Sequence, residues 1–482
     1  MYQGANFING NWIDRNDFID INPANEEILG HFPQSNDQEV ANAIAAAKNA
    51  FKSWRKLSRV KRSDYFFKLA QLVERDKNEL AQIISYETGK NLNESLAEVI
   101  ESLHMCQIAF GSGRTACGDW MASEISEKDA YVLRKPKGVV GVISPWNFPL
   151  AVPLWSSAPA IIEGNCIIHK PSELTPYISQ KITALHQEAG FPDGVYNLVH
   201  GDGNVGAKIV HHPDVSCILF TGSYTVGASI QQVCAADPRK SCSCETGSKS
   251  ATIVFADGNQ DLALDVAIAS AFKLSGQRCV SSSRILIEQS IAKEFGDAFA
   301  ERASKLITGD PFENPVPFYG PLINENQRVR VESYNQLVDQ GLMLKGRRLD
   351  RKGYYLTPHV YRATWGDQRY LKEEVFGPHV ALIPFKDADE AIYIHNDTEF
   401  GLAVGVVTDD FRKMRQCRDD LNAGMIYLNA GSIAAESHLP FGGLGKSGNG
   451  HKSAAGTYRA VTDEVAVTVN YERGITWAQG MS

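Results

Sequence analysis

The spacing of hydrophobic residues in the first part of the chain is that of helices. Val40, Ile44 and Ala47 recur every three or four positions behind a possible helix cap at Asn36, and similar patterns continue to about Gly113. Residues at this spacing share one face of a helix, which can then pack against a core. We therefore expect helices to dominate residues 36–113.

Short runs of β-forming residues, each followed by a helical pattern, fill most of the remaining chain. Before residue 247 the runs are GVVGVIS, NCIIHK, GVYNLVHG and SCILFTGS, and after it they are SATIVFA, SRILIEQS, HVALIPF, GLAVGVVT and AGMIYLNA. Strands that alternate with helices are typical of βαβ units and parallel sheets. The sequence therefore predicts two α/β domains that meet near residue 247. Its length of 482 residues agrees with this division, because a single core stops growing at roughly 250–300 residues.

Other signals concern the pairing of strands. Asn9-Gly10 lies between two short apolar runs, which is the strongest local signal for a hairpin. The segments AYVLRKP at 130–136 and EVAVTVNYE at 464–472 alternate in side-chain character and have no obvious partner in their own neighbourhoods. We expect these two segments to pair with each other as an edge ribbon.

Composition and charge exclude several classes of protein. A formal net charge of −8, without a basic stretch rich in aromatic residues, argues against nucleic acid as a partner. The nine cysteines are odd in number and scattered, unlike a secreted disulfide framework. The N-terminal residues lack the basic and apolar regions of a signal peptide. We therefore expect a cytoplasmic protein.

The segment from Gly138 to Ile162 carries no charged residue and is long enough to span a bilayer. Four prolines, among them Pro145 and Pro153, interrupt it and would leave backbone groups unsatisfied in lipid. We interpret it as a buried strand, a turn and a buried helix, and we expect no membrane association.

Two segments contain candidate groups for catalysis. Cys279 follows Gly-Gln-Arg in FKLSGQRCVSSSR, and Glu245 stands among small residues in CSCETGSKS. Taken alone, each has an ordinary explanation, a small buried thiol and a solvated surface acid. Cys242 and Cys244 lack a second Cys/His pair at ligand spacing, so we expect no metal.

Two strand ends contain candidate groups for a nucleotide. ILFTGSYTVG places Gly222 and Ser223 at a strand-to-helix turn, with Gly227 just inside the helix, where a phosphate can approach the backbone. The spacing is not G-x-G-x-x-G, so a plain tight turn is an equal interpretation. Lys170 and Glu173 in IIHKPSE end another strand and could meet ribose hydroxyls.

Taken together, these segments resemble the aldehyde dehydrogenase superfamily, in the same order and at similar separations. The matching segments are PWNFP with Trp146 and Asn147, KPSE with Lys170 and Glu173, FTGS followed by Gly227, ETGSKS with Glu245, GQRC with Cys279, EEVFGP with Glu374 and Phe376, and LPFGG near the C-terminus. The resemblance covers nearly the whole chain. It implies two Rossmann-type α/β domains with a small β ribbon for oligomerisation: a NAD-binding domain at 1–116 and 136–246, a catalytic domain at 247–445, and the ribbon at 117–135 and 460–482.

The resemblance also implies a mechanism. Cys279 would attack the aldehyde carbon, and the Asn147 amide and the Cys279 backbone N–H would hold the oxyanion. Hydride transfer to a nicotinamide would leave a thioester, which Glu245 would help to hydrolyse as the general base. A silent structural relative and a CoA-acylating relative are the alternatives, and the retained Glu245 argues against the second.

The cofactor residues follow from the same resemblance. Gly222, Ser223 and Gly227 would hold the pyrophosphate, Lys170 and Glu173 the adenosine ribose, and Glu374 the nicotinamide ribose. Phe376 would pack beside the nicotinamide, and Trp146 would also contact the cofactor. A carboxylate at Glu173 would repel a 2′-phosphate, which favours NAD and leaves NADP as the alternative.

The substrate is the least defined part of the prediction. By family position Val152, Trp155, Arg278, Val280 and Ser432 in the loop 430–438 would line the entrance. Thr246 and Ser248 depart from the usual E-L-G-G-K, and GLGKSGN around Gly445 resembles the succinylglutamate-semialdehyde dehydrogenase branch. We expect a small aldehyde substrate, with a carboxylate-bearing semialdehyde as the specific hypothesis. A structurally paired Arg278 is the competing interpretation. The resemblance implies a homodimer or a homotetramer.

Overall fold

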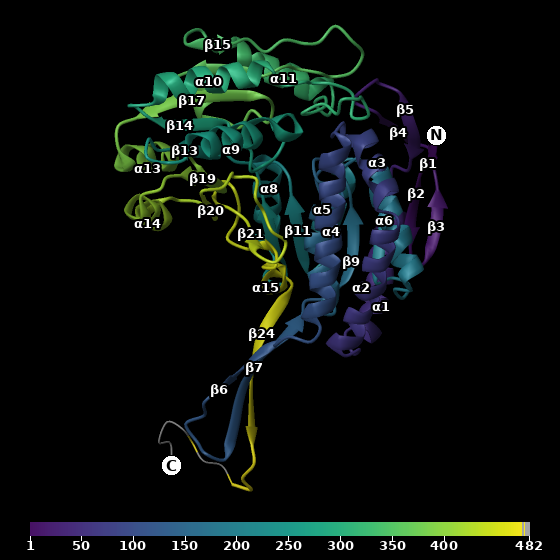
Figure 1. The fold of residues 1–482 in the computed structure, drawn as a ribbon. Coiled ribbons are helices and arrows are strands. Elements are labelled where there is room, and N and C mark those ends of the chain that lie inside the picture. The colour runs from purple at the N-terminus through teal and green to yellow at the C-terminus, as the bar shows by residue number, and fades with distance from the viewer. Residues whose placement is uncertain (475–476, 478–482) are drawn as a thin grey trace.

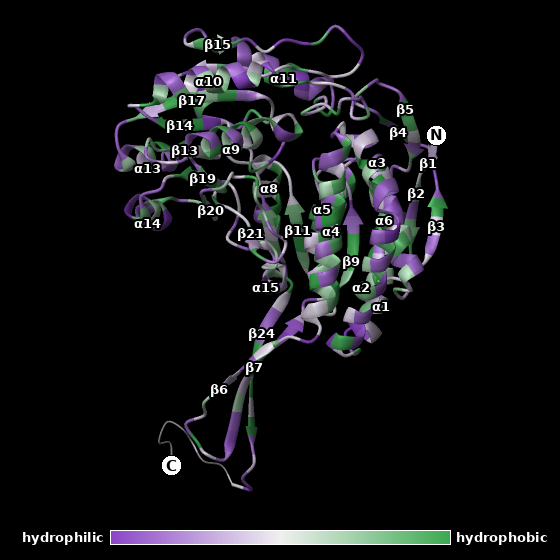
Figure 2. Ribbon diagram, viewed as in Figure 1, coloured by the Kyte–Doolittle hydropathy of each residue, from purple (hydrophilic) through white to green (hydrophobic). Residues whose placement is uncertain are grey.

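The computed structural model describes residues 1–474 and 477. Two α/β bodies, each built on a seven-stranded sheet, lie side by side, and a narrow ribbon projects from them (Figure 1). This is the predicted fold class. In Figure 2 hydrophobic residues gather on sheet strands such as β11, whereas the surface helix α14 is mostly hydrophilic.

The first sheet has the strand order β12-β11-β8-β9-β10-β2-β3. Its strands are β2 (Ala5–Ile8), β3 (Asn11–Asp14), β8 (Val139–Ile143), β9 (Cys166–Lys170), β10 (Tyr196–Leu198), β11 (Cys217–Thr221) and β12 (Ser241–Glu245). The five strands from β12 to β10 are parallel. The predicted hairpin is confirmed: β2 and β3 pair antiparallel, and Asn9 and Gly10 both have positive φ angles, 49° and 81°. Strand β12 was not predicted, because SCSCE contains none of the β-branched or aromatic residues that favour a strand.

Eight helices cover the first sheet and its edges. They are α1 (Asp37–Trp54), α2 (Arg59–Arg75), α3 (Lys77–Thr88), α4 (Leu92–Ser112), α5 (Ala151–Ile162), α6 (Pro176–Ala189), α7 (Gly203–His211) and α8 (Tyr224–Ala235). A capping box formed by Asn36 and Glu39 starts α1, at the predicted cap. The uncharged segment from Gly138 is the buried strand β8 followed by the buried helix α5, as expected. Among the described residues no helix has the length and apolar character to cross a membrane.

The second sheet has the order β15-β16-β17-β14-β13-β19-β20, and it is parallel from β16 to β20. Its strands are β13 (Ala251–Val254), β14 (Arg284–Glu288), β15 (Leu342–Leu344), β16 (His359–Arg362), β17 (His379–Phe385), β19 (Ala403–Val407) and β20 (Met425–Leu428). Its helices are α9 (Gln260–Phe272), the 3₁₀ turn η1 (Lys273–Gly276), α10 (Ala292–Ser304), α11 (Glu325–Gln336), α12 (Arg369–Lys372), α13 (Ala388–Asn396) and α14 (Phe411–Asp420).

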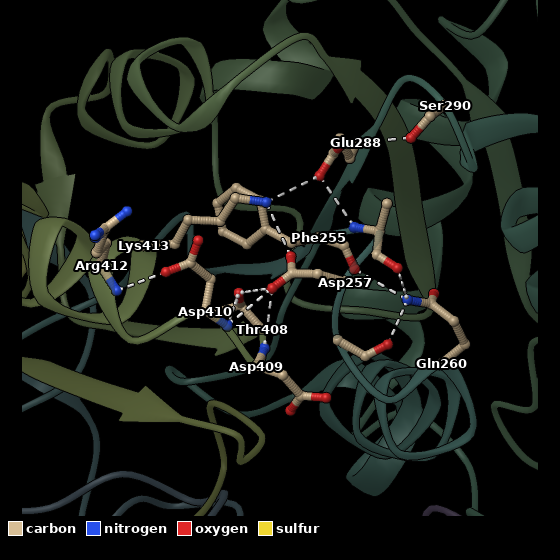
Figure 3. Close-up of polar contacts among 12 residues, drawn as sticks. Phe255, Asp257, Gln260, Glu288, Ser290, Thr408, Asp409, Asp410, Arg412 and Lys413 are labelled. Carbon is tan, nitrogen blue, oxygen red and sulfur yellow. Dashed lines mark hydrogen bonds and ion pairs between the residues drawn. The ribbon is translucent and has the colours of Figure 1, made fainter.

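A polar cluster holds the loops at one edge of this second sheet (Figure 3). Asp257, in the loop after β13, accepts hydrogen bonds from the Thr408 hydroxyl (2.8 Å), the Asp410 backbone (2.9 Å) and Lys413 (2.9 Å). Asp410 in turn caps α14 through the Arg412 backbone N–H. Because every oxygen of Asp257 is satisfied internally, we assign the cluster a structural role in tying two loops together.

The projecting ribbon consists of β6 (Gly118–Met121), β7 (Lys128–Pro136) and β24 (Thr462–Asn470). Strands β7 and β24 pair antiparallel from Lys128↔Asn470 to Thr462↔Pro136, which confirms the predicted pairing of the two segments. Residues 475, 476 and 478–482 of the predicted ribbon lie outside the described residues.

Small elements complete the fold. They are β1 (Tyr2–Gln3), β4 (Phe18–Ile21) and β5 (Ile28–Phe32) in one sheet, the pairs β18 (Phe400–Gly401) with β22 (Leu444–Gly445) and β21 (Pro440–Phe441) with β23 (Ser453–Ala454), and α15 (Thr457–Ala460).

Candidate active site

The predicted functional residues gather where the two sheets face each other. Asn147, Lys170, Gly222 and Glu245 lie at or just after the carboxyl ends of the parallel strands β8, β9, β11 and β12. Ligands of open α/β sheets bind at this edge. Cys279 lies shortly before β14 and Glu374 shortly before β17, so both come from the opposite edge, the amino ends, of the second sheet.

A cavity of about 600 Å³ brings most of these residues together. The predicted catalytic and cofactor residues on its wall are Trp146, Asn147, Gly222, Ser223, Cys279, Glu374 and Phe376. The predicted substrate residues on its wall are Val152, Trp155, Arg278 and Val280. Lys170, Glu173, Gly227, Glu245 and Ser432 do not line it. A separate hollow of about 760 Å³ beside β15–β17 contains none of the predicted residues.

The surroundings of Cys279 favour its protonated thiol. Burial, together with the nearby carboxylates Glu374 and Glu245, raises the pKa of Cys279 to about 12. The backbone N–H groups of Cys279 and Val280 favour the thiolate and act in the opposite direction. The thiol is therefore a latent nucleophile, which an added positive charge in the cavity would activate.

Asn147 is oriented by the segment that carries the cysteine. Its Nδ2 donates to the Gln277 carbonyl at 2.9 Å, two residues before Cys279. An amide nitrogen has a second N–H. That group and the backbone N–H of Cys279 are donors of the kind that an oxyanion requires.

Glu245 is buried against the C-terminal loop. Its Oε2 accepts a hydrogen bond from the Gly443 backbone N–H at 3.1 Å, and a side chain at Gly442 would overlap its Oε1. Burial raises the pKa of Glu245 well above its usual range, whereas the Gly443 N–H and the charge of Lys452 lower it. A carboxylate with a raised pKa is suited to accept a proton.

The cofactor side of the cavity has the features of an anion site. Ser223 caps α8 by accepting from the Val226 N–H (3.5 Å), and the first turn of this helix has no acidic residue. The Trp146 and Phe376 rings meet edge to face at 5.6 Å. Glu374 accepts from the Ser248 backbone N–H at 2.7 Å, and burial raises its pKa to about 7. Lys170 pairs with Glu173 at 3.5 Å.

On the substrate side, the structure places Ser432 outside the cavity, and it gives Arg278 both a structural partner and a place on the cavity wall. Ser432 is fully buried, donates to the Val280 carbonyl (2.6 Å) and hydrogen-bonds to Ser282, so it offers no donor to a substrate. Arg278 lines the cavity, yet its Nη2 already pairs with Glu94 at 3.3 Å and its guanidinium lies over the Phe148 ring. Arg278 is therefore both structurally paired and exposed to the cavity.

Two residues at the site were not predicted from the sequence. Glu101 lines the cavity from α4, and Lys249 is buried beneath the Glu374 segment. Glu94, Glu98 and Glu101 follow one another at helical spacing, a pattern that could have drawn attention to Glu101. Within residues 1–474 and 477 no group of three or more His, Cys, Asp or Glu side chains could hold a metal ion.

The family model of the aldehyde dehydrogenase family matches residues 12–467 of the chain. The chain belongs to the aldehyde dehydrogenase family. This confirms the resemblance that the ordered motifs indicated, and it identifies the protein as an oxidoreductase.

Named relatives of this aldehyde dehydrogenase cover nearly its whole length. It is 35% identical to an alpha-ketoglutaric semialdehyde dehydrogenase of Bacillus subtilis, over 92% of this chain and 93% of the relative. It is 36% identical to a malonate-semialdehyde dehydrogenase of Lacticaseibacillus casei, over 97% of each chain.

Solved structures of aldehyde dehydrogenases also match nearly the whole length of this chain. A betaine aldehyde dehydrogenase of Staphylococcus aureus in complex with NAD⁺ has a TM-score of 0.93 and 30% identity, covering 98% of this chain and 99% of its own. A NAD-dependent aldehyde dehydrogenase of Sinorhizobium meliloti has a TM-score of 0.94 and 31% identity, covering 99% and 96%.

Proposed function

We propose that this protein oxidises an aldehyde to a carboxylic acid with NAD, through a thioester on Cys279, and that the aldehyde is a semialdehyde bearing a carboxylate. The observation that carries the proposal is that Cys279 and Asn147 share one cavity with Glu374 and Phe376. The names of the two semialdehyde dehydrogenase relatives support the substrate class.

The residues present fit a dinucleotide. The turn Thr221-Gly222-Ser223 lines the cavity at the start of α8, where free backbone N–H groups suit a pyrophosphate. Glu374 would bind ribose hydroxyls, and Trp146 and Phe376 offer flat faces for a nicotinamide. When bound, NAD supplies the hydride acceptor. Glu173 still favours NAD over NADP, although it does not line the cavity.

Each catalytic group has one task in this proposal. The Cys279 thiolate attacks the aldehyde carbon, and the Asn147 amide with the Cys279 backbone N–H holds the resulting oxyanion. Glu245 takes a proton from the water that hydrolyses the thioester. Since Glu245 faces Gly443 in this structure, it must turn toward Cys279 for that step.

Substitution of the nucleophile tests the proposal. Cys279→Ser should abolish NADH formation while NAD still binds, because a serine hydroxyl is not activated in a site that disfavours anions. NADH absorbance and calorimetric NAD binding measure the two effects. Near-normal turnover of this variant would refute the thioester mechanism.

Substitution of the base tests the second half-reaction. Glu245→Gln should form the thioester and then stall, which gives a burst of NADH followed by slow turnover. Stopped-flow absorbance would resolve the two phases. Normal steady-state turnover would remove Glu245 from the scheme.

Two alternatives are separated by adding coenzyme A to the assay. A CoA-acylating relative would need coenzyme A for turnover, and a silent relative would form no NADH with any aldehyde. The retained Glu245 favours hydrolysis over acyl transfer. We also propose that the NAD-binding and catalytic domains meet at residues 246–247, that the protein is cytoplasmic, and that it assembles as a dimer or a tetramer.

A further inference from the structure

Glu101 and Arg278 line the substrate end of the cavity. Their buried neighbours Glu94, Glu98 and Lys90 do not line it, and the group as a whole has three carboxylates and two cations. Lys90 and Glu98 form a fully buried ion pair. Glu98 also accepts hydrogen bonds from the backbone N–H groups of Leu150 and Ala151 at the start of α5. Glu94 pairs with Arg278. Glu101 is therefore the carboxylate left over.

Polar atoms around this end lack partners among the described residues. Glu101 Oε1, Arg278 Nε and Trp155 Nε1 are buried without a hydrogen bond, and all three residues line the cavity. Leaving such groups unsatisfied costs roughly 1–3 kcal/mol each. A ligand tail that satisfied them would need an acceptor for the arginine and tryptophan nitrogens and a donor for the carboxylate.

A carboxylate alone meets only half of this requirement. It could bind to Arg278, but it would add a second uncompensated negative charge beside Glu101. Burial and the charge of Glu98 disfavour the ionised form of Glu101 and raise its pKa, although Arg278 and Lys90 act in the opposite direction, so a second anion beside Glu101 would be disfavoured as well. A neighbouring ammonium would offset that charge and donate to Glu101.

We infer that the semialdehyde carries a protonated amino group beside its carboxylate, with Arg278 binding the carboxylate and Glu101 the ammonium. This inference rests on the proposed function and narrows it to amino-acid semialdehydes. Glu101 is thus a residue that determines specificity within the substrate class.

Three aldehydes of four carbons test the inference, because they differ only in their tails: butanal, succinate semialdehyde and aspartate 4-semialdehyde. We expect kcat/KM for aspartate semialdehyde to exceed that for succinate semialdehyde by about tenfold or more, since a charge-assisted hydrogen bond contributes at least this much. Glu101→Gln, which keeps the shape and removes the charge, should lower activity on aspartate semialdehyde about tenfold and leave succinate semialdehyde unchanged or improved.

The matched control is Glu436→Gln, an exposed acid on the loop beside the entrance that does not line the cavity. It should leave the ratio of the two activities unchanged. A wild-type preference for succinate semialdehyde, or an equal loss of both activities in Glu101→Gln, would overturn the inference.

A binding measurement keeps the two proposals separate. Homoserine and 4-hydroxybutyrate are the corresponding alcohols and need no turnover. Calorimetry should show tighter binding of homoserine to the wild type, and this preference should disappear in Glu101→Gln. If no aldehyde yields NADH, the proposed function fails, whereas equal binding of the two alcohols contradicts the role of Glu101.

Discussion

At the scale of single residues, the negative charge of Glu374 opposes ionisation of the Cys279 thiol. Glu374 faces the cavity beside Cys279, and after burial it is the largest cause of the raised pKa of the thiol. Glu374→Gln removes this charge, so the pKa of Cys279 should fall and the thiolate fraction should rise. We expect several-fold faster alkylation by iodoacetamide at pH 8 without NAD, where the carboxyl of Glu374, with a pKa of about 7, is mostly ionised.

The neighbouring acid provides the control for this prediction. Glu373 belongs to the same segment and also lines the cavity, but its carboxylate is paired with Arg369 and Tyr334. Glu373→Gln should leave the alkylation rate unchanged. Slower alkylation of Glu374→Gln than of the wild type would show that its carboxylate does not oppose the thiolate.

At the scale of elements, the short segment from Glu373 to Phe376 is held by donors to four successive carbonyls. Lys249 Nζ donates to Tyr370 and Glu373 (2.9 and 2.7 Å), Arg330 to Glu374 (2.7 Å), and Gln327 to Val375 and Phe376 (3.2 and 2.6 Å). Phe376 has a φ of 61°, a left-handed conformation that a side chain adopts only when its surroundings impose it. The segment is therefore positioned by its contacts and not by its own preference.

Lys249→Met tests whether the hydrogen bonds that hold the segment from Glu373 to Phe376 are needed for cofactor binding. The substitution leaves the two carbonyls beside Lys249 without their buried lysine donor, at a cost of about 1–3 kcal/mol. We expect KM for NAD to rise about tenfold, with a smaller change in kcat, because Glu374 loses its position and Cys279 does not. Steady-state kinetics with NAD varied would measure the split.

Arg369→Gln is the matched control, because it breaks the exposed pair with the Glu373 side chain and the contact with Tyr334 but removes no donor to the carbonyls of the segment. Exposed pairs contribute about 0–1 kcal/mol, so KM for NAD should stay within about twofold. An unchanged KM in Lys249→Met would mean that Arg330 and Gln327 hold the segment without the lysine.

The same scale shows what the sequence could predict. Strands such as β8, β9 and β11 are mostly apolar and buried on both faces, and all three were predicted. Strand β12 was missed because SCSCE lacks β-branched and aromatic residues, and its burial beside β11 comes from packing that local pattern does not encode. Ser432 was placed at the entrance by its family position. Its contact with Val280 joins residues about 150 positions apart, and no sequence spacing reveals it.

At the scale of the whole molecule, the ribbon formed by β6, β7 and β24 has apolar side chains and strand edges that a monomer would leave exposed. Strand β6 is exposed at all four residues, and Trp120 and Met121 are 70% and 53% exposed. In the described part of the chain β6 and β24 are the two edges of this sheet, with backbone groups open to a partner. Exposed apolar residues on a projecting edge are typical of an oligomer interface.

We therefore expect the ribbon to join subunits. Wild-type protein should be a dimer or a tetramer in light scattering, and Trp120→Lys with Met121→Lys should shift it toward smaller species, because the added charges must be buried at the interface. Phe411→Lys is the control, since Phe411 is 72% exposed on α14, away from the ribbon, and should leave the mass unchanged. Because the cavity lies between the two sheets of one chain, the dissociated variant should retain activity if it stays folded. A wild-type protein that is folded, active and monomeric would show that the ribbon is not an oligomer interface.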